Sequence, residues 1–108
     1  MKVLLVVCNV PDAILARQMA ETLVGERLAA CVNILPGCES VYRWQGKLES
    51  ASEIPLLIKT TDTVYAALER RIQELHPYEV AEIIALPIVA GLAAYQQWVA
   101  EETGGGQG

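Results

Sequence analysis

The stretch that decides the fold runs from Val3 to Asp12 and reads VLLVVCNVPD. Residues 3–8 are a continuous apolar run, which is typical of a buried strand. Asn9–Asp12 is a helix-start signal. Apolar residues then recur at the spacing of one helical face: Ala16, Met19, Ala20, Leu23 and Val24. The chain is therefore expected to open with a strand and a helix, and Gly25 is the predicted C-terminal cap of that helix.

Beyond Gly25 the pattern becomes extended. Residues 28–34 and 39–44 are predicted strand segments on either side of Pro36-Gly37, which bends or interrupts them. Gln45-Gly46 is a two-residue hairpin turn, and the return strand runs to Thr60 from residue 48. Pro55 within this strand predicts an edge or a bulge.

A second helix is expected between Thr60-Thr61-Asp62, whose side chains suit an N-terminal cap, and His76-Pro77, which stops it. Its buried stripe is predicted to contain Val64, Leu68, Ile72 and Leu75. Residues 82–89 form the predicted last strand and residues 91–102 a C-terminal helix. The order β-α-β-β-α-β plus a helix predicts an α+β, ferredoxin-like fold with a four-stranded antiparallel sheet and two helices on one face.

The composition favours an assembly of subunits. Of 108 residues, 53% are hydrophobic and only 19% are charged, against about a quarter charged in ordinary domains. We expect one domain over residues 1–103, a Gly-rich disordered tail over residues 104–108, and one sheet face that the chain leaves uncovered. Subunit interfaces resemble a core cut in half, so the uncovered face predicts an oligomer, with the hairpin around residues 45–46 reaching a neighbour.

The net charge and the cysteine content indicate which kinds of binding partner and which cellular compartment suit this chain. A net charge of −5 with eight Lys and Arg disfavours binding to a phosphate backbone, so no nucleic-acid partner is predicted. No stretch approaches the ~20 apolar residues of a membrane span, so no membrane partner is predicted either. Three cysteines without CxxC spacing do not form a disulfide framework, and a reducing cytoplasm is expected.

Other classes of domain share this element order but require residues that are missing here. RNA-recognition domains need aromatic residues on their central strands, where Val3–Val7 and Leu56–Ile58 are aliphatic. Metal chaperones carry CxxC in the first loop, and acyl-phosphate hydrolases need an Arg there. Asn9–Asp12 has neither. With no activating motif near Cys8 or Cys38 and no phosphate-binding glycine loop, an enzyme is not predicted.

Five linked motifs carry a resemblance to the CutA divalent-cation tolerance family, over residues 3–102. In chain order they are ERLAACVNILPG (26–37), SVYRWQGK (40–47), LIKTT (57–61), HPYEV (76–80) and EIIALPI (82–88). The resemblance implies a tight homotrimer of ferredoxin-like subunits, related in architecture to PII-type signalling trimers. It also implies a role in tolerance of divalent metals, copper especially. Ala81 replaces a usual proline, and Leu75 replaces a histidine that some members have.

The resemblance points to Cys8 and His76 as metal ligands, because these positions pair in a copper-binding member. Thiolate and imidazole suit copper, yet Cys8 also fits a small buried hydrophobe. His76, the only histidine, also fits a helix C-terminal cap. The implied ligand is copper(II) or another divalent metal, not tightly bound, because two ligands are few. Glu79, Glu82 or a neighbouring subunit would complete the site.

Six further residues in the matching motifs have two interpretations: Tyr42, Trp44, Lys59, Tyr78, Glu79 and Glu82. They either pack at subunit contacts or line ligand clefts between subunits, as in PII-type trimers. Cys31, inside an apolar run, is predicted to lie in the core, and Cys38 to be more exposed.

Three functional hypotheses follow. The first is a homotrimeric copper-binding protein of metal homeostasis. The second is a PII-like signalling module with a small-molecule ligand and an unknown protein partner, and the third is a structural assembly unit.

Overall fold

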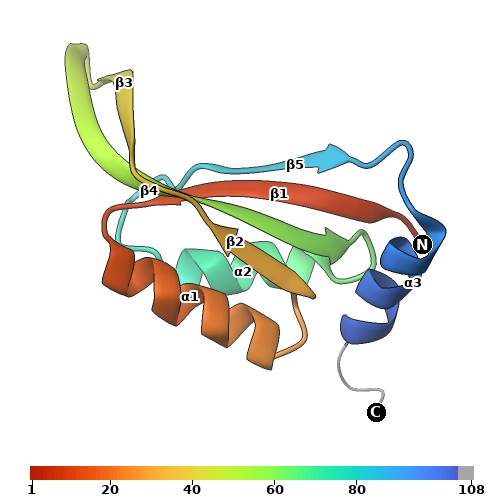
Figure 1. Ribbon diagram of the computed structural model, residues 1–108. Helices are drawn as coiled ribbons and strands as arrows, with labels where there is room; N and C mark the ends of the chain where they lie inside the picture. Colours follow the sequence, from red (N-terminus) through yellow and green to blue (C-terminus); the bar gives the residue numbers. More distant parts are fainter. Residues whose placement is uncertain (105–108) are drawn as a thin grey trace.

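The computed structural model describes residues 1–104, and within them the chain forms five strands and three helices (Figure 1). In chain order the elements are β1 (Val3–Val10), α1 (Ala13–Gly25), β2 (Cys31–Ile34), β3 (Cys38–Trp44), β4 (Lys47–Thr61), α2 (Tyr65–Leu75), β5 (Ile83–Pro87) and α3 (Ala93–Glu102). Residues 105–108 of the predicted tail lie outside the described residues. Gly104 donates its N–H to the carbonyl of Arg27 at 3.1 Å.

Every strand pair is antiparallel, and the order β2-β4-β1-β5 gives the four-stranded sheet that the sequence predicts. The α+β, ferredoxin-like fold is thereby confirmed. β3 is a fifth strand that pairs only with residues 47–53 of β4, and together they form a long arm that leaves the body of the molecule (Figure 1). Pro55 lies just past this arm, where β4 exchanges β3 for β2 as its neighbour and fewer backbone N–H groups are needed.

The core lies between the sheet and two helices, α1 and α2, which cover the same face (Figure 1). In β1 every second side chain, Val6, Cys8 and Val10, is fully buried on this face. Most of the two predicted stripes supplies the other wall, with Met19, Leu23, Leu68 and Ile72 fully buried, but Val24 is exposed and Val64 precedes α2. Among the described residues, none of the helices is long and apolar enough to cross a membrane.

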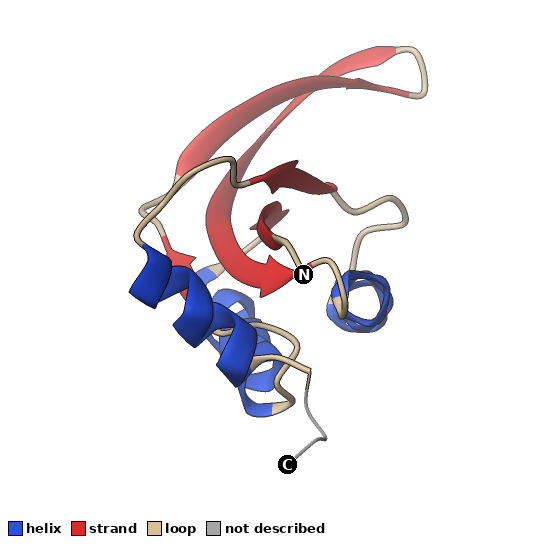
Figure 2. Cartoon of the chain, turned by 90° about the vertical axis from the view of Figure 1, so that its right-hand side faces the viewer, coloured by secondary structure: helices blue, strands red, loops and turns tan. Residues whose placement is uncertain are grey.

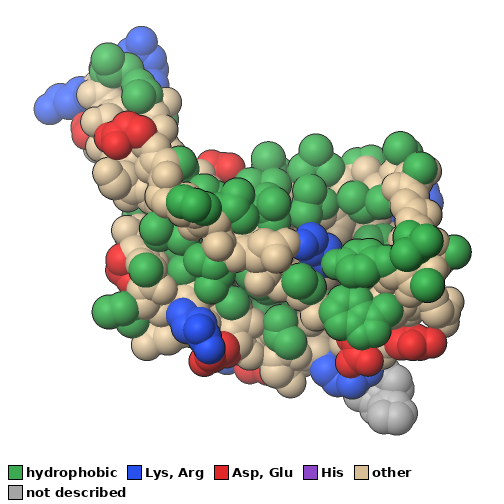
Figure 3. All heavy atoms as spheres, in the orientation of Figure 1, with side chains coloured by type: hydrophobic (Ala, Val, Ile, Leu, Met, Phe, Trp, Pro, Cys, Tyr) green, Lys and Arg blue, Asp and Glu red, His purple; other side chains and the backbone are tan. Residues whose placement is uncertain are grey.

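The opposite face of the sheet is open to solvent and apolar. In register across the strands it carries Leu5 and Val7 of β1, Leu57 of β4, and Ile84 and Leu86 of β5. Ile84 and Leu86 are about half exposed, and hydrophobic side chains cover the upper side of the molecule in Figure 3. Seen from the end, the sheet curls and α3 lies beside it rather than across it (Figure 2).

The local turn signals have mixed outcomes. The helix start predicted at Asn9–Asp12 is confirmed, and Asp12 is the cap of α1, because its carboxylate accepts the N–H of Leu15 at 2.8 Å. The hairpin turn is also confirmed: Gln45 and Gly46 both have positive φ, at 52° and 80°, as this class of tight turn requires. The prediction of Gly25 as a C-terminal cap is wrong. Gly25 is still helical, and Arg27 takes the left-handed conformation with φ 61°.

The predicted cap of the second helix is also wrong, for a tertiary reason. α2 begins after Val64, which offers no side-chain cap. Asp62 is instead paired with Lys2: its carboxylate accepts the Lys2 N–H at 2.9 Å, and its own N–H donates to the Lys2 carbonyl. These two bonds extend the β1–β4 ladder beyond Thr61. The β2 strand likewise starts at Cys31 and not at residue 28, because the N–H groups of Leu28 and Ala29 close the end of α1.

Candidate functional site

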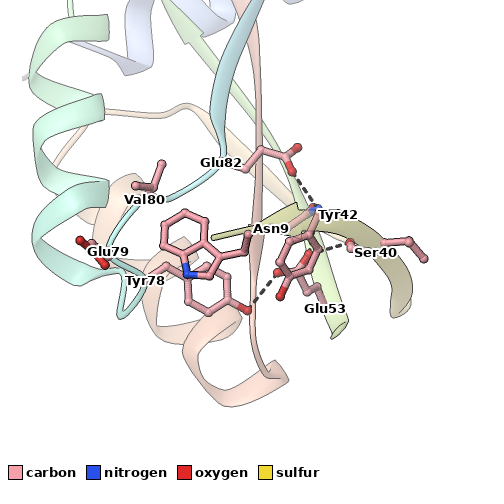
Figure 4. A pocket seen from close by; sticks show the side chains of 10 residues that line it. Asn9, Ser40, Tyr42, Glu53, Tyr78, Glu79, Val80 and Glu82 are labelled. Carbon is pink, nitrogen blue, oxygen red and sulfur yellow. Dashed lines mark hydrogen bonds between the residues drawn. The ribbon is translucent and has the colours of Figure 1, made fainter. Parts of the chain in front are cut away.

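A groove of about 600 Å³ lies between the β3–β4 arm, the end of β1 and the segment that follows α2 (Figure 4). Five of the six predicted cleft residues line it: Tyr42, Trp44, Tyr78, Glu79 and Glu82. The sixth, Lys59, lies elsewhere on the open sheet face. A cavity of this size is in the range that small-molecule sites occupy. The structure thus brings together side chains that are up to 40 positions apart in the chain.

Glu53 is the central side chain of the groove, and sequence reasoning missed it. It is only 7% exposed. Its Oε1 accepts from the Ser40 hydroxyl at 2.7 Å and from Asn9 Nδ2 at 3.4 Å, and its Oε2 accepts from the Tyr78 hydroxyl at 2.9 Å. Asn9 Nδ2 also donates to Glu82 at 3.3 Å (Figure 4). Glu53 thereby holds three segments of the chain together at one carboxylate.

Strand alternation and the end of α2 explain how these side chains converge. Ser40, Tyr42 and Trp44 are every second residue of β3, so they share one face of the arm. Glu53 belongs to this same face, because it pairs in register with Cys38. On the other side of the groove, Pro77 ends α2 and turns the chain back, which directs Tyr78 toward Glu53.

The groove is acidic and has aromatic walls. Three carboxylates line it, and no Lys, Arg or His side chain does. Burial, the hydrogen bond to Glu53 and the charge of Glu53 raise the pKa of Tyr78 to about 12. Tyr78 therefore remains a protonated donor to Glu53 throughout the neutral range. The arrangement favours a positively charged occupant over an anion.

Cys8 and His76, the two predicted metal ligands, share a contact with Asn9, which lines the groove. Both contact the carbonyl oxygen of Asn9: His76 Nε2 at 2.7 Å and Cys8 Sγ at 3.9 Å. His76 Nδ1 accepts the N–H of Tyr78 at 3.2 Å, so Nε2 carries the proton that it donates to Asn9. Both imidazole nitrogens are engaged, and the ring lies 4.6 Å from that of Tyr78.

The surroundings of Cys8 favour the thiol over the thiolate. Cys8 is fully buried. Burial first, and then the charges of Glu82 and Glu53, raise its pKa from the ordinary 9.0 to about 12. Across residues 1–104, no group of three or more His, Cys, Asp and Glu side chains is placed to hold a metal ion. Within one chain, the sulfur of Cys8 and both ring nitrogens of His76 already make hydrogen bonds. A metal site at Cys8 and His76 therefore stays a prediction.

The Cys8 thiol predicts a loss of stability at alkaline pH. Its pKa is higher in the folded than in the unfolded chain, so its contribution is complete below pH 9 and is lost as pH rises toward 12. We expect the free energy of unfolding to fall between pH 9 and 10, with a slope approaching about 1.4 kcal/mol per pH unit as the unfolded thiol ionises. Tyr65 and Tyr78, whose pKa values rise from 10.0 to about 12, add to the slope as pH approaches 10, so the Cys8 contribution is cleanest between pH 8 and 9.

Denaturant titrations at pH 8, 9 and 10 measure this slope, and Cys8→Ala should lower it, most clearly between pH 8 and 9, even if its stability is lower at every pH. Cys38→Ala is the matched control and should retain the slope. Equal slopes in wild type and Cys8→Ala would contradict the assignment.

Lys59 and Cys31 form a separate polar cluster on the open sheet face. The ammonium of Lys59 donates to the side-chain oxygen of Asn33 and lies 3.9 Å from Cys31 Sγ. The prediction that Cys31 lies in the core is wrong: it is half-buried, because it pairs in register with Lys59 on the uncovered face. Cys38 is half-buried as well, and all three cysteines are free thiols.

Comparisons with known proteins identify a family of related sequences and solved structures with the same fold. The sequence profile of a family described as CutA1 divalent ion tolerance protein matches residues 4–102. The divalent-cation tolerance protein CutA of Thermus thermophilus is 50% identical over 99 residues, which are 92% of this chain and 96% of the relative. Human protein CutA is 45% identical over 86% of this chain, and the chain spans about half of its length. A solved structure of the Thermus thermophilus protein superposes with a TM-score of 0.93 at 49% identity, covering 94% of this chain and 99% of that one.

Proposed function

The chain belongs to the CutA1 divalent ion tolerance family, and from this premise we propose that it is a homotrimer that binds copper(II) or a related divalent cation in metal homeostasis. Cys8 and His76 are the proposed ligands. The observation that supports the proposal is their common contact with the Asn9 carbonyl, at which a sulfur and a nitrogen donor meet the same oxygen atom. Donors of these two types favour copper over the other divalent ions of the first transition row.

Metal binding at Cys8 and His76 is opposed by the burial of the thiol and by the hydrogen bond of the imidazole. A thiol with a pKa of about 12 is ionised in roughly one molecule in 10⁵ at pH 7, and His76 must release Asn9 before its Nε2 can bind a metal. We therefore propose weak binding, roughly micromolar or weaker, that strengthens as pH rises. Glu79, Glu82 or a neighbouring subunit supplies the remaining ligands in this proposal.

Copper titration of the assembled protein by calorimetry tests the proposal. Cys8→Ser and His76→Ala should each weaken binding by about tenfold or more, and the double variant should add little, because either change already opens the same site. Cys38→Ser removes a thiol away from Asn9 and should bind as wild type does. Unchanged titrations in both single variants would sink the site.

The assembly and the compartment belong to the same proposal. Ile84, Leu86 and the other apolar side chains of the open sheet face support a trimer, because a surface of this kind is stabilised by burial against another copy. The unit that assembles is one ferredoxin-like domain over residues 1–103. Three free thiols support a reducing cytoplasm as its location. We propose no enzymatic reaction.

A second candidate function is a PII-like module that binds a small molecule and reports to a protein partner. The groove around Glu53 favours it, because aromatic walls with a few convergent polar groups are typical of ligand sites. Its three carboxylates disfavour nucleotides and other phosphates as the ligand. Calorimetry with a nucleotide panel beside the copper titration distinguishes the two candidates.

A further inference from the structure

The Glu53 carboxylate has a charge without a charged partner. It is more than nine-tenths buried, and the side chains that contact it, Ser40, Tyr78 and Asn9, are neutral donors. No ion pair involving Glu53 occurs in residues 1–104. A buried charge that is hydrogen-bonded but unpaired attracts a cation more strongly than an exposed one, because less water screens it.

The hydrogen-bonding capacity of Glu53 is, however, largely used. A carboxylate offers about four acceptor positions, and three are occupied: two at Oε1 and one at Oε2. A primary ammonium must place three N–H donors, and a small metal ion needs several oxygen ligands. Either ion could take one contact from the free position of Glu53, but a second contact with this carboxylate would displace Ser40, Tyr78 or Asn9. A cation that carries charge but no N–H donors can leave these bonds intact.

The walls of the groove suit such a cation. Tyr42, Trp44 and Tyr78 line it, and each leaves between 38% and 43% of its surface exposed. Aromatic faces attract cations through their quadrupole, and quaternary ammonium ions are the ligands for which this attraction counts most. Val41 and Val80 add apolar surface for alkyl groups. Lys47, opposite Trp44 in the hairpin register, does not line the groove.

We propose that this groove binds a quaternary, methylated ammonium compound, with its cationic head between the aromatic side chains and the Glu53 carboxylate. The proposal rests on the groove being a ligand site, which is the second candidate function above, and it names the ligand class. Its cationic head contacts neither Cys8 nor His76, so choline and copper titrations test the two proposals separately, although Glu79 and Glu82 line the groove as well.

Fluorescence of Trp44 tests the proposal in the assembled protein. Trp98→Phe leaves Trp44 as the only indole, since the chain has two. Three probes are compared at constant ionic strength: choline, its uncharged carbon isostere 3,3-dimethylbutan-1-ol, which has the same size, and the smaller primary amine ethanolamine, which lacks the three methyl groups. We expect a saturable change with choline and about tenfold weaker responses to the other two, because one lacks the charge and the other lacks the methyl groups and has more N–H donors than Glu53 has free acceptor positions.

Two variants in the Trp98→Phe background locate the site. Glu53→Gln keeps the shape but removes the charge, and should weaken choline binding about tenfold. The matched control, Glu101→Gln on α3, makes the same chemical change away from the groove and should have no effect. Should Glu53→Gln fail to fold, Tyr42→Leu removes one aromatic wall and should weaken choline binding by several-fold.

The proposal would be overturned by equal curves for choline and its neutral isostere, or by choline binding that neither Glu53→Gln nor Tyr42→Leu weakens. It would equally be overturned if choline changed the emission no more than sodium chloride does. Copper is titrated into the same preparation. A copper response without a choline response refutes only the ligand class named here, whereas a choline response without a copper response refutes only the metal proposal.

Discussion

Ile84→Asp is expected to convert the assembled protein into single folded chains. Ile84 is 53% exposed within one chain and lies on the open face of β5, so the change should cost the isolated fold little. In a trimer the same position is buried in our proposal, and each copy would have to bury an unpaired carboxylate at a cost of several kcal/mol. Symmetry repeats this cost in every subunit.

Light scattering measures the outcome directly. Wild type should have three times the chain mass of 11.7 kDa, and Ile84→Asp should have the mass of one chain with an unchanged far-ultraviolet spectrum. Ile14→Asp is the matched control: Ile14 is 74% exposed on α1, off the sheet, and this variant should stay assembled. A wild-type mass of 11.7 kDa, or an intact trimer in Ile84→Asp, would refute burial of the open face.

Ile58→Ala is expected to lower the free energy of unfolding by about 4 kcal/mol. Ile58 is fully buried in the middle of β4, in register with Val6 on one side and Val32 on the other. Removing three buried carbons there loses transfer free energy and leaves a cavity between the sheet and the helices. Such truncations cost roughly 2–5 kcal/mol, and a site held between two strands and two helices has little freedom to collapse.

Denaturant titrations at equal protein concentration test this, because assembly contributes to the apparent stability of both proteins. Ile14→Ala makes the same truncation at an exposed helical position and should change the free energy by less than about 0.5 kcal/mol. A loss below about 1 kcal/mol for Ile58→Ala would contradict the position of Ile58 at the centre of the core.

The elements that the sequence predicted correctly have short-range causes. The strand predicted over residues 3–8, the helix start at Asn9–Asp12 and the turn at Gln45-Gly46 each depend on residues within a few positions. The predictions that failed were local signals overridden by distant partners. Asp62 is a good capping residue, yet Lys2 takes its carboxylate and extends a ladder instead. Arg27, not Gly25, adopts the left-handed conformation, and its guanidinium donates to the Glu101 carbonyl at 2.7 Å.

The groove was predictable only in part. Motif resemblance selected Tyr42, Tyr78 and Glu82, which the structure places around one cavity. Nothing in the local sequence indicates that Glu53 is buried, because residues 48–53 are LESASE, a pattern typical of a solvent-exposed hairpin arm. Its burial arises only where the arm crosses the end of β1 and meets the segment after α2.

The sequence by itself determined which side chains share a face, because alternation in a strand and the 3.6-residue period in a helix are local geometry. Cys8 and Cys31 illustrate what it left open, since both are thiols within apolar strands. Only the tertiary structure decided that helices cover Cys8, and that Cys31 lies beside Lys59 on the uncovered face. Burial and electrostatic surroundings depend on groups brought from far along the chain, and these set the pKa of Cys8 and the acidity of the groove.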